Sequence, residues 1–108
     1  MPIAREFRET VQTRAKADAR YHAAMLTVAI NELLAGDLGT AKAILRDHVN
    51  ATITFERLAK ETGLPVKSLQ RMLGPMGNPT AENLFTVIKA LQDAGHITMA
   101  VKPTRHAA

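Results

Sequence analysis

The sequence predicts an all-α protein, a small bundle of short helices that ends in one β-strand. The 108 residues are rich in alanine, leucine, lysine and arginine, with four aromatic residues, and this composition favours helices. Apolar residues recur every three or four positions along most of the chain, which is the period of an amphipathic helix. Near the C-terminus they alternate every second position instead, which is the period of a strand.

Two helices are expected before residue 37. In residues 3–17 an apolar residue recurs every four positions, and this thin stripe suits a helix that lies over the domain or against a partner. The stripe consists of Ile3, Phe7 and Val11. The role of this helix stays open between a solvated helix, a dimer or toxin contact, and DNA-backbone contacts through Arg5 and Arg8. Asp18 can cap the second helix, which runs to about residue 35.

A third helix is expected over residues 38–50. Gly36 suits the left-handed position that ends the preceding helix, and Asp37 can cap the next one at once. The inner face of the third helix is expected to hold Leu38, Ala41, Ile44, Leu45 and Val49. The stretch "NATIT" at 50–54 then breaks the helical period.

Two short helices follow, joined by a tight corner. The first covers residues 55–62, with Thr54 as its N-cap and Gly63 as its stop. Pro65 has a fixed φ and no N–H, which suits the edge of a helix start, so the second helix covers residues 66–73. Two short helices around a turn with a glycine are typical of a helix-turn-helix.

A last helix and the strand complete the chain. The loop at 74–79 is rich in glycine and proline, Thr80 caps a helix over 81–94, and "HITMAVK" at 96–102 alternates as a strand does. Residues 103–108 are expected to fray. Because a lone strand has unpaired backbone groups, it is expected to pair with the same strand of a second copy. The expected dimer contacts are Ile97, Met99 and Val101. The alternative is a segment that folds back on its own helices as an extended tail.

The outward side of the 66–73 helix carries residue types that read DNA bases. At 100° per residue, positions 67, 70 and 71 share one face. The side chains of Lys67 and Arg71 can donate to guanine O6 and N7, that of Gln70 can pair with adenine, and Val66 can touch a thymine methyl group. The chain has a net charge of +4, and no acidic residue lies between Glu61 and Glu82. Such a gap fits a surface that faces an anion, although a solvated basic face would look the same.

The run "FERLAKETGLPVKSLQRMLGPMGNPTAENLFTVIKAL" at 55–91 resembles the Cro/lambda-repressor-like helix-turn-helix family. The matching features are Leu58-Ala59, Gly63-Leu64, Leu69, Arg71, "GNPT" at 77–80, and the Leu84, Ile88 and Leu91 of the closing helix. Within that family the chain is most similar to addiction-module antidotes and small transcriptional regulators. The resemblance spans about 37–102, so we expect a DNA-binding domain there. Helices in 1–36 would serve packing or dimer contacts, and the whole would form one compact domain.

The resemblance implies a sequence-specific double-stranded DNA-binding regulator, most simply a homodimeric repressor. By position it implies base contacts from Val66, Lys67, Gln70 and Arg71, and backbone contacts from Thr54, Ser68, Asn78 and Thr80. Pro65 and Phe55 replace polar residues that the family uses to grip the DNA backbone. The alternative function is an antitoxin that binds a partner toxin and autoregulates its operon, and a third is an interaction module without DNA binding.

Other classes of function receive no support from the residues. The chain has no cysteine, which excludes disulfides and thiolate metal sites. Its four histidines lack ligand spacing, so neither a metal site nor a cofactor is expected, and no nucleophile–base pattern indicates an enzyme. No apolar run could span a bilayer, and the first ten residues lack the apolar stretch of a secretory signal, so a cytoplasmic protein with no membrane partner is expected.

Overall fold

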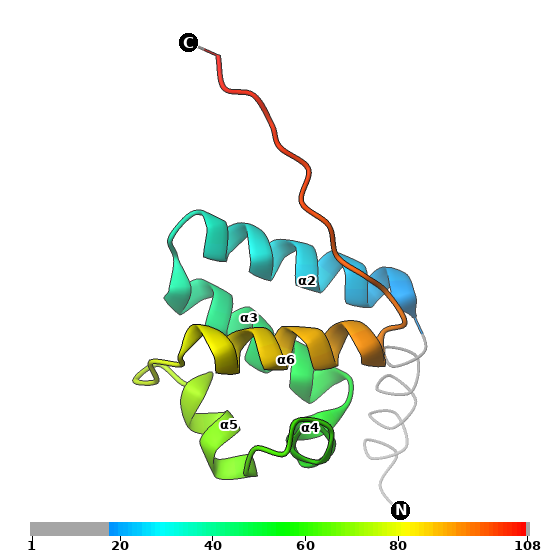
Figure 1. The fold of residues 1–108 in the computed structure, drawn as a ribbon, viewed down its shortest axis with the longest axis vertical. Helices are drawn as coiled ribbons and strands as arrows, with labels where there is room; N and C mark the ends of the chain where they lie inside the picture. Colours follow the sequence, from blue (N-terminus) through cyan, green and yellow to red (C-terminus); the bar gives the residue numbers. More distant parts are fainter. Residues whose placement is uncertain (1–17, 108) are drawn as a thin grey trace, which may run out of the picture.

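The computed structural model describes residues 18–107, which form five α-helices (Figure 1). They are α2 (Ala19–Leu34), α3 (Leu38–Ala51), α4 (Thr54–Thr62), α5 (Val66–Met72) and α6 (Ala81–Ala94). Each lies within a residue or two of the helix that the sequence predicts. The expected helix at 3–17 lies outside the described residues. None of the described helices is long and apolar enough to cross a membrane.

Side-chain caps fix where three of these helices begin. The carboxylate of Asp18 accepts the backbone N–H of Arg20 at 2.9 Å, and that of Asp37 accepts the N–H of Thr40 at 3.0 Å and its hydroxyl at 2.7 Å. These hydrogen bonds hold the pKa of both carboxyl groups below the ordinary value. The Thr80 side chain caps α6 in the same way. Capping depends on neighbouring residues alone, which is why the sequence predicted these starts.

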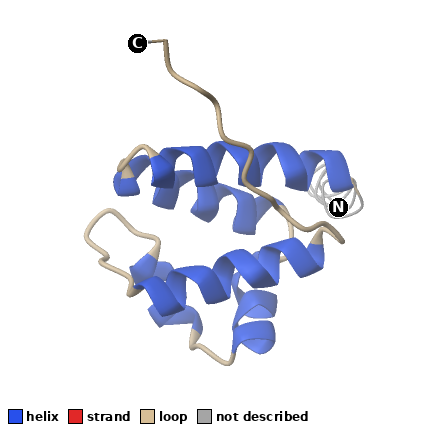
Figure 2. Ribbon diagram, turned by 45° about the horizontal axis from the view of Figure 1, so that its top comes forward, coloured by secondary structure: helices blue, strands red, loops and turns tan. Residues whose placement is uncertain are grey.

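The helices form two tiers (Figures 1 and 2). α2 and α3 pack together as a hairpin, while α4 and α5 lie at the other end of the body, and α6 runs between the two tiers. One apolar core joins them, and its fully buried members come from all five helices. Among them are Leu26, Leu45, Val49, Leu58, Leu69, Val87 and Leu91.

The predicted C-terminal strand is wrong. Within the described residues there is no β-strand, and residues 97–107 follow α6 as extended chain. Ile97 and Met99 pack against the core, while Thr98 and Ala100 face solvent, so the alternation correctly marks extended backbone. A strand also needs a neighbouring strand for its N–H and C=O groups. Here the amide oxygen of Gln92 accepts the N–H of Met99 at 2.7 Å instead.

Residues 101–107 are the last described part of the chain and are called the C-terminal arm below. All of them are exposed, and they project from the end of the body opposite α4 and α5 (Figure 1). The expected dimer contacts therefore separate: Ile97 and Met99 belong to the chain's own core, and only Val101 is open to solvent. Residues 97–99 instead match the alternative expectation, a segment that folds back on the chain's own helices.

Two histidines are buried side by side between α2 and α3. The rings of His22 and His48 meet edge to face with centroids 4.8 Å apart, and the ring of Tyr21 stacks on His48 at 5.7 Å. Among the described residues, neither ring nitrogen of His48 has a hydrogen-bond partner. Burial, and then the nearby His22, lowers the pKa of His48 to about 4. Gly95 makes room for this pair, since a Cβ there would lie 2.6 Å from the His22 side chain.

Candidate nucleic-acid interface

α4 and α5 form the corner that the sequence predicts. α4 ends at Gly63, whose φ of 77° is left-handed and whose N–H donates to the carbonyl of Ala59 at 2.8 Å. The Thr62 hydroxyl then accepts the N–H of Leu64 at 3.2 Å, and Pro65 begins α5. Figure 1 shows α4 end-on and α5 from the side, so the two helices cross, as those of a helix-turn-helix do.

Three buried leucines hold the two helices at this crossing. Leu58 of α4, Leu69 of α5 and Leu73 just after it are fully buried in the core. A seven-residue helix such as α5 has too few backbone hydrogen bonds to persist by itself. Its position is therefore set by these contacts, which point one side of α5 inward and leave the other side outward.

The outward side of α5 carries three of the four predicted base-contact residues. Lys67, Gln70 and Arg71 are exposed, and within the described part of the chain neither cation forms an ion pair. Val66 is half-buried against the core, which reduces its reach, and Ser68 is half-buried too. The result is a short polar ridge with two free cations and an amide.

α3 fastens the carboxyl end of α5. The ammonium group of Lys42, itself buried, donates to the carbonyl of Gly77 at 2.5 Å, and the guanidinium of Arg46 donates to the carbonyl of Leu73 at 2.8 Å. Cations at this end complement the helix dipole. Gly77 has to be glycine, since a Cβ would collide with the carbonyl of Arg71. Neither Lys42 nor Arg46 could be assigned a role from the sequence, because only the fold brings α3 to this loop.

The predicted backbone-contact residues lie at helix starts and in the loop. Thr54 opens α4 with a φ of 70°, which is strained for a β-branched residue, and its hydroxyl accepts the N–H of Arg57 at 3.4 Å. That bond is the one an N-cap makes, although the helix begins at Thr54 itself. Thr80 and Asn78 are exposed, and the Thr80 hydroxyl accepts the N–H of Asn83 at 3.1 Å.

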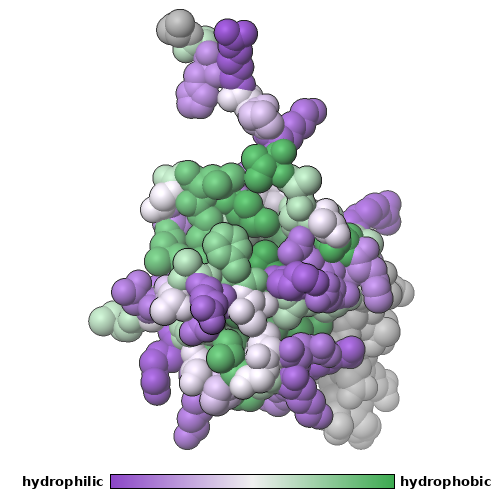
Figure 3. Space-filling model, in the orientation of Figure 1, coloured by the Kyte–Doolittle hydropathy of each residue, from purple (hydrophilic) through white to green (hydrophobic). Residues whose placement is uncertain are grey.

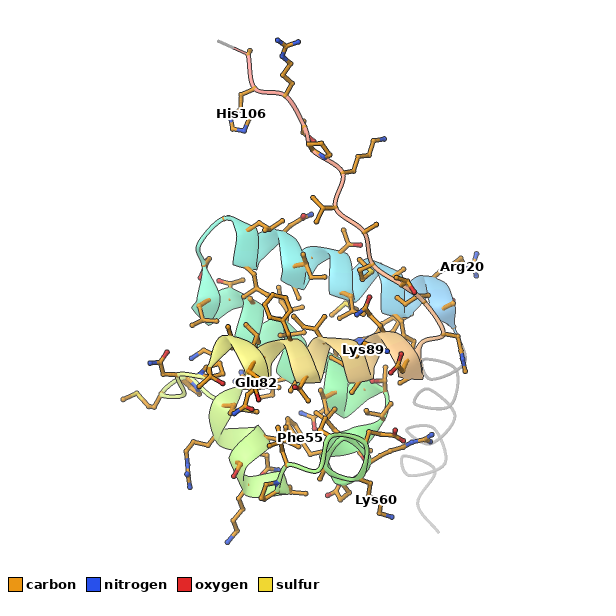
Figure 4. All side chains as sticks on the ribbon, in the orientation of Figure 1. Arg20, Phe55, Lys60, Glu82, Lys89 and His106 are labelled. Carbon is orange, nitrogen blue, oxygen red and sulfur yellow. The ribbon has the colours of Figure 1, made fainter. Side chains whose placement is uncertain are left out.

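Lys60 is a further candidate that the sequence analysis missed. It is exposed in the last turn of α4 and points away from the body at the end where α5 lies (Figure 4). It could have been found from the sequence as a basic residue about one helical turn before Gly63. Together with Arg57, Lys67 and Arg71 it outnumbers the exposed carboxylates of α4, which are Glu56 and Glu61. The described helices α4 and α5 therefore carry a net positive charge, which suits a polyanion.

Comparison with protein-family models, with curated proteins and with solved structures found no match to this chain. The resemblance to the lambda-repressor-like family therefore stays a prediction. The case for a function rests on the geometry of α4 and α5 and on the charges they carry.

Proposed function

We propose that this protein is a cytoplasmic transcriptional regulator that binds double-stranded DNA, acting as a repressor and as a homodimer. The observation that supports it most is the exposed side of α5. Lys67, Gln70 and Arg71 lie there without competing ion pairs in residues 18–107, on a helix whose other side is locked into the core.

In this mechanism α5 enters the major groove. An α-helix fits that groove, and its outward side chains reach base edges. The guanidinium of Arg71 donates two hydrogen bonds to one guanine, Lys67 donates to a second acceptor, and the amide of Gln70 pairs with adenine. Leu69 and Leu73 keep the helix rigid, so that these donors keep a fixed spacing along the base pairs.

Contacts to the phosphates set the register of α5 on the duplex. Lys60 supplies a charge from α4, and the backbone N–H groups at the starts of α4 and α6, beside Thr54 and Thr80, supply donors. Such contacts carry no sequence information but contribute most of the salt-dependent affinity. Repression follows if the bound protein occupies a promoter.

The test begins with a selection of bound duplexes from a random pool by the purified protein. On the selected site, Arg71→Ala is expected to weaken binding by about tenfold or more, corresponding to about 1–3 kcal/mol, and to relax the preference at one base pair. Arg105→Ala is the matched control, because Arg105 is an exposed arginine on the C-terminal arm, at the far end from α5.

Two outcomes would contradict the proposal. A pool that yields no enriched sequence rules out sequence-specific reading. Equal losses of affinity in Arg71→Ala and Arg105→Ala would indicate that net charge, rather than α5, binds the DNA.

A further inference from the structure

An apolar face lies on α2 and α6 and is used by no contact described so far. Its most exposed members are Leu34 at 68%, Phe85 at 64% and Val101 at 74% of their full surface. Leu34 is the last residue of α2, and the fold leaves its apolar side chain in solvent. Figure 3 shows hydrophobic residues gathered in the upper part of the visible face, where α2 and α6 lie in Figure 1.

These side chains surround a groove of about 400 Å³ between α2, α6 and residues 99–102. Ile30, Leu33 and Ile88 contribute apolar surface to it, and among residues 18–107 Lys102 is the one charged residue that lines it. Exposed apolar patches of this kind mark contacts with other molecules, because leaving them in water is unfavourable.

The charges of the groove favour a second copy of this chain as the occupant. A twofold contact places a surface against itself, so a surface with many charges of one sign would repel its own copy. The groove avoids this, because its other described polar residues are neutral. They are Thr27, Asn31 and Gln92. The outward side of α5, by contrast, carries Lys67 and Arg71 on a helix without an acidic residue, so it would repel its own copy.

The place of the face relative to α5 favours the same occupant. The apolar face looks toward the viewer in Figure 3, whereas α5 lies at the lower end of the same view. Consider a twofold axis that lies in the plane of the apolar face and runs vertically in Figure 3. Rotation about this axis brings the apolar faces of the two copies together. Both α5 helices then lie at one end of the dimer, where paired half-sites require them, and both arms leave at the other end.

We propose that the apolar face around Leu34, Phe85 and Val101 is the contact between the two copies of a homodimer. The inference rests on the proposed function for its biological use, since the dimer presents two reading helices to one operator. It replaces the predicted pairing of C-terminal strands with packing of α2 and α6.

The test is sedimentation equilibrium of the full chain without DNA. The wild-type chain is expected at twice its mass of 11.7 kDa. Leu34→Glu and Phe85→Glu each place a carboxylate in the apolar contact and are expected to raise the dimer dissociation constant by more than about tenfold. Met76→Glu is the matched control, because Met76 is 95% exposed in the 74–79 loop, away from the face.

Each outcome decides the proposal. Dissociation in both face variants with retention of the dimer in Met76→Glu supports it, and the exposure of both residues means that circular dichroism should show an unchanged helical content. A monomeric wild-type chain overturns it, and a different protein such as a toxin is then the occupant to test. A dimer that survives both face variants, or that Met76→Glu also breaks, overturns it too. Because no DNA is present, failure of the proposed function leaves this result intact.

Discussion

The buried His48 should make this protein lose stability in mild acid. Its ring is fully buried beside His22 and Tyr21, and its pKa of about 4 lies well below the ordinary 6.5. Between these two pH values the unfolded chain binds a proton that the folded chain does not. The free energy of unfolding therefore falls as the pH falls through 6.5 toward 4.

The size of the effect follows from the difference in pKa. One pKa unit corresponds to about 1.4 kcal/mol, so the full shift of the His48 pKa is worth at most about 3.5 kcal/mol. The free energy of unfolding is therefore expected to fall by about 2 kcal/mol between pH 7.5 and pH 5. The capping carboxylates of Asp18 and Asp37 add nothing in this window, because their pKa values lie below 3.8.

The assay is urea unfolding, followed by circular dichroism, at several pH values between 7.5 and 4.5. His48→Phe keeps an aromatic ring under Tyr21 but cannot be protonated, so its stability should depend much less on pH. His106→Gln is the control, because His106 lies exposed on the C-terminal arm and its loss should leave the wild-type profile unchanged. Parallel profiles for the wild-type chain and His48→Phe would refute the reasoning.

Two further predictions concern the elements around α5. Lys42→Met removes the hydrogen bond to Gly77 while keeping a buried side chain of similar length, so amide hydrogen exchange should speed up in α5 and the 74–79 loop. Unchanged exchange rates there would mean that the buried leucines alone hold α5 in place. Thr54→Gly relieves a left-handed φ and should raise the free energy of unfolding by about 1 kcal/mol in thermal melts. The same variant lacks the Thr54 hydroxyl, so it should also bind DNA more weakly if that hydroxyl contacts a phosphate. A lower free energy of unfolding in Thr54→Gly would show that the hydrogen bond from the Arg57 N–H to the hydroxyl outweighs the backbone strain at Thr54.

Local chemistry explains how much of the fold the sequence predicted. Asp18, Asp37 and Thr80 bond to backbone N–H groups two or three residues away, and Gly63 turns the chain within its own neighbourhood. Such interactions do not depend on the rest of the molecule. The corner between α4 and α5 and the outward positions of Lys67, Gln70 and Arg71 follow from the same local rules and from the helical period.

Caps, turns and periodicity act over a few residues, so the helices, their ends and the exposed polar side of α5 can be derived from neighbouring residues alone. The remaining features depend on contacts between distant segments. Residues 97–99 had the alternation of a strand, but no second strand lies beside them in the described chain, so they pack on α6 instead. Lys42 and His48 are polar, yet the packing of α3 buries both, and Leu34 is apolar, yet α2 turns it outward. Pairing and burial depend on which segments meet across the fold, and a local pattern does not contain that information.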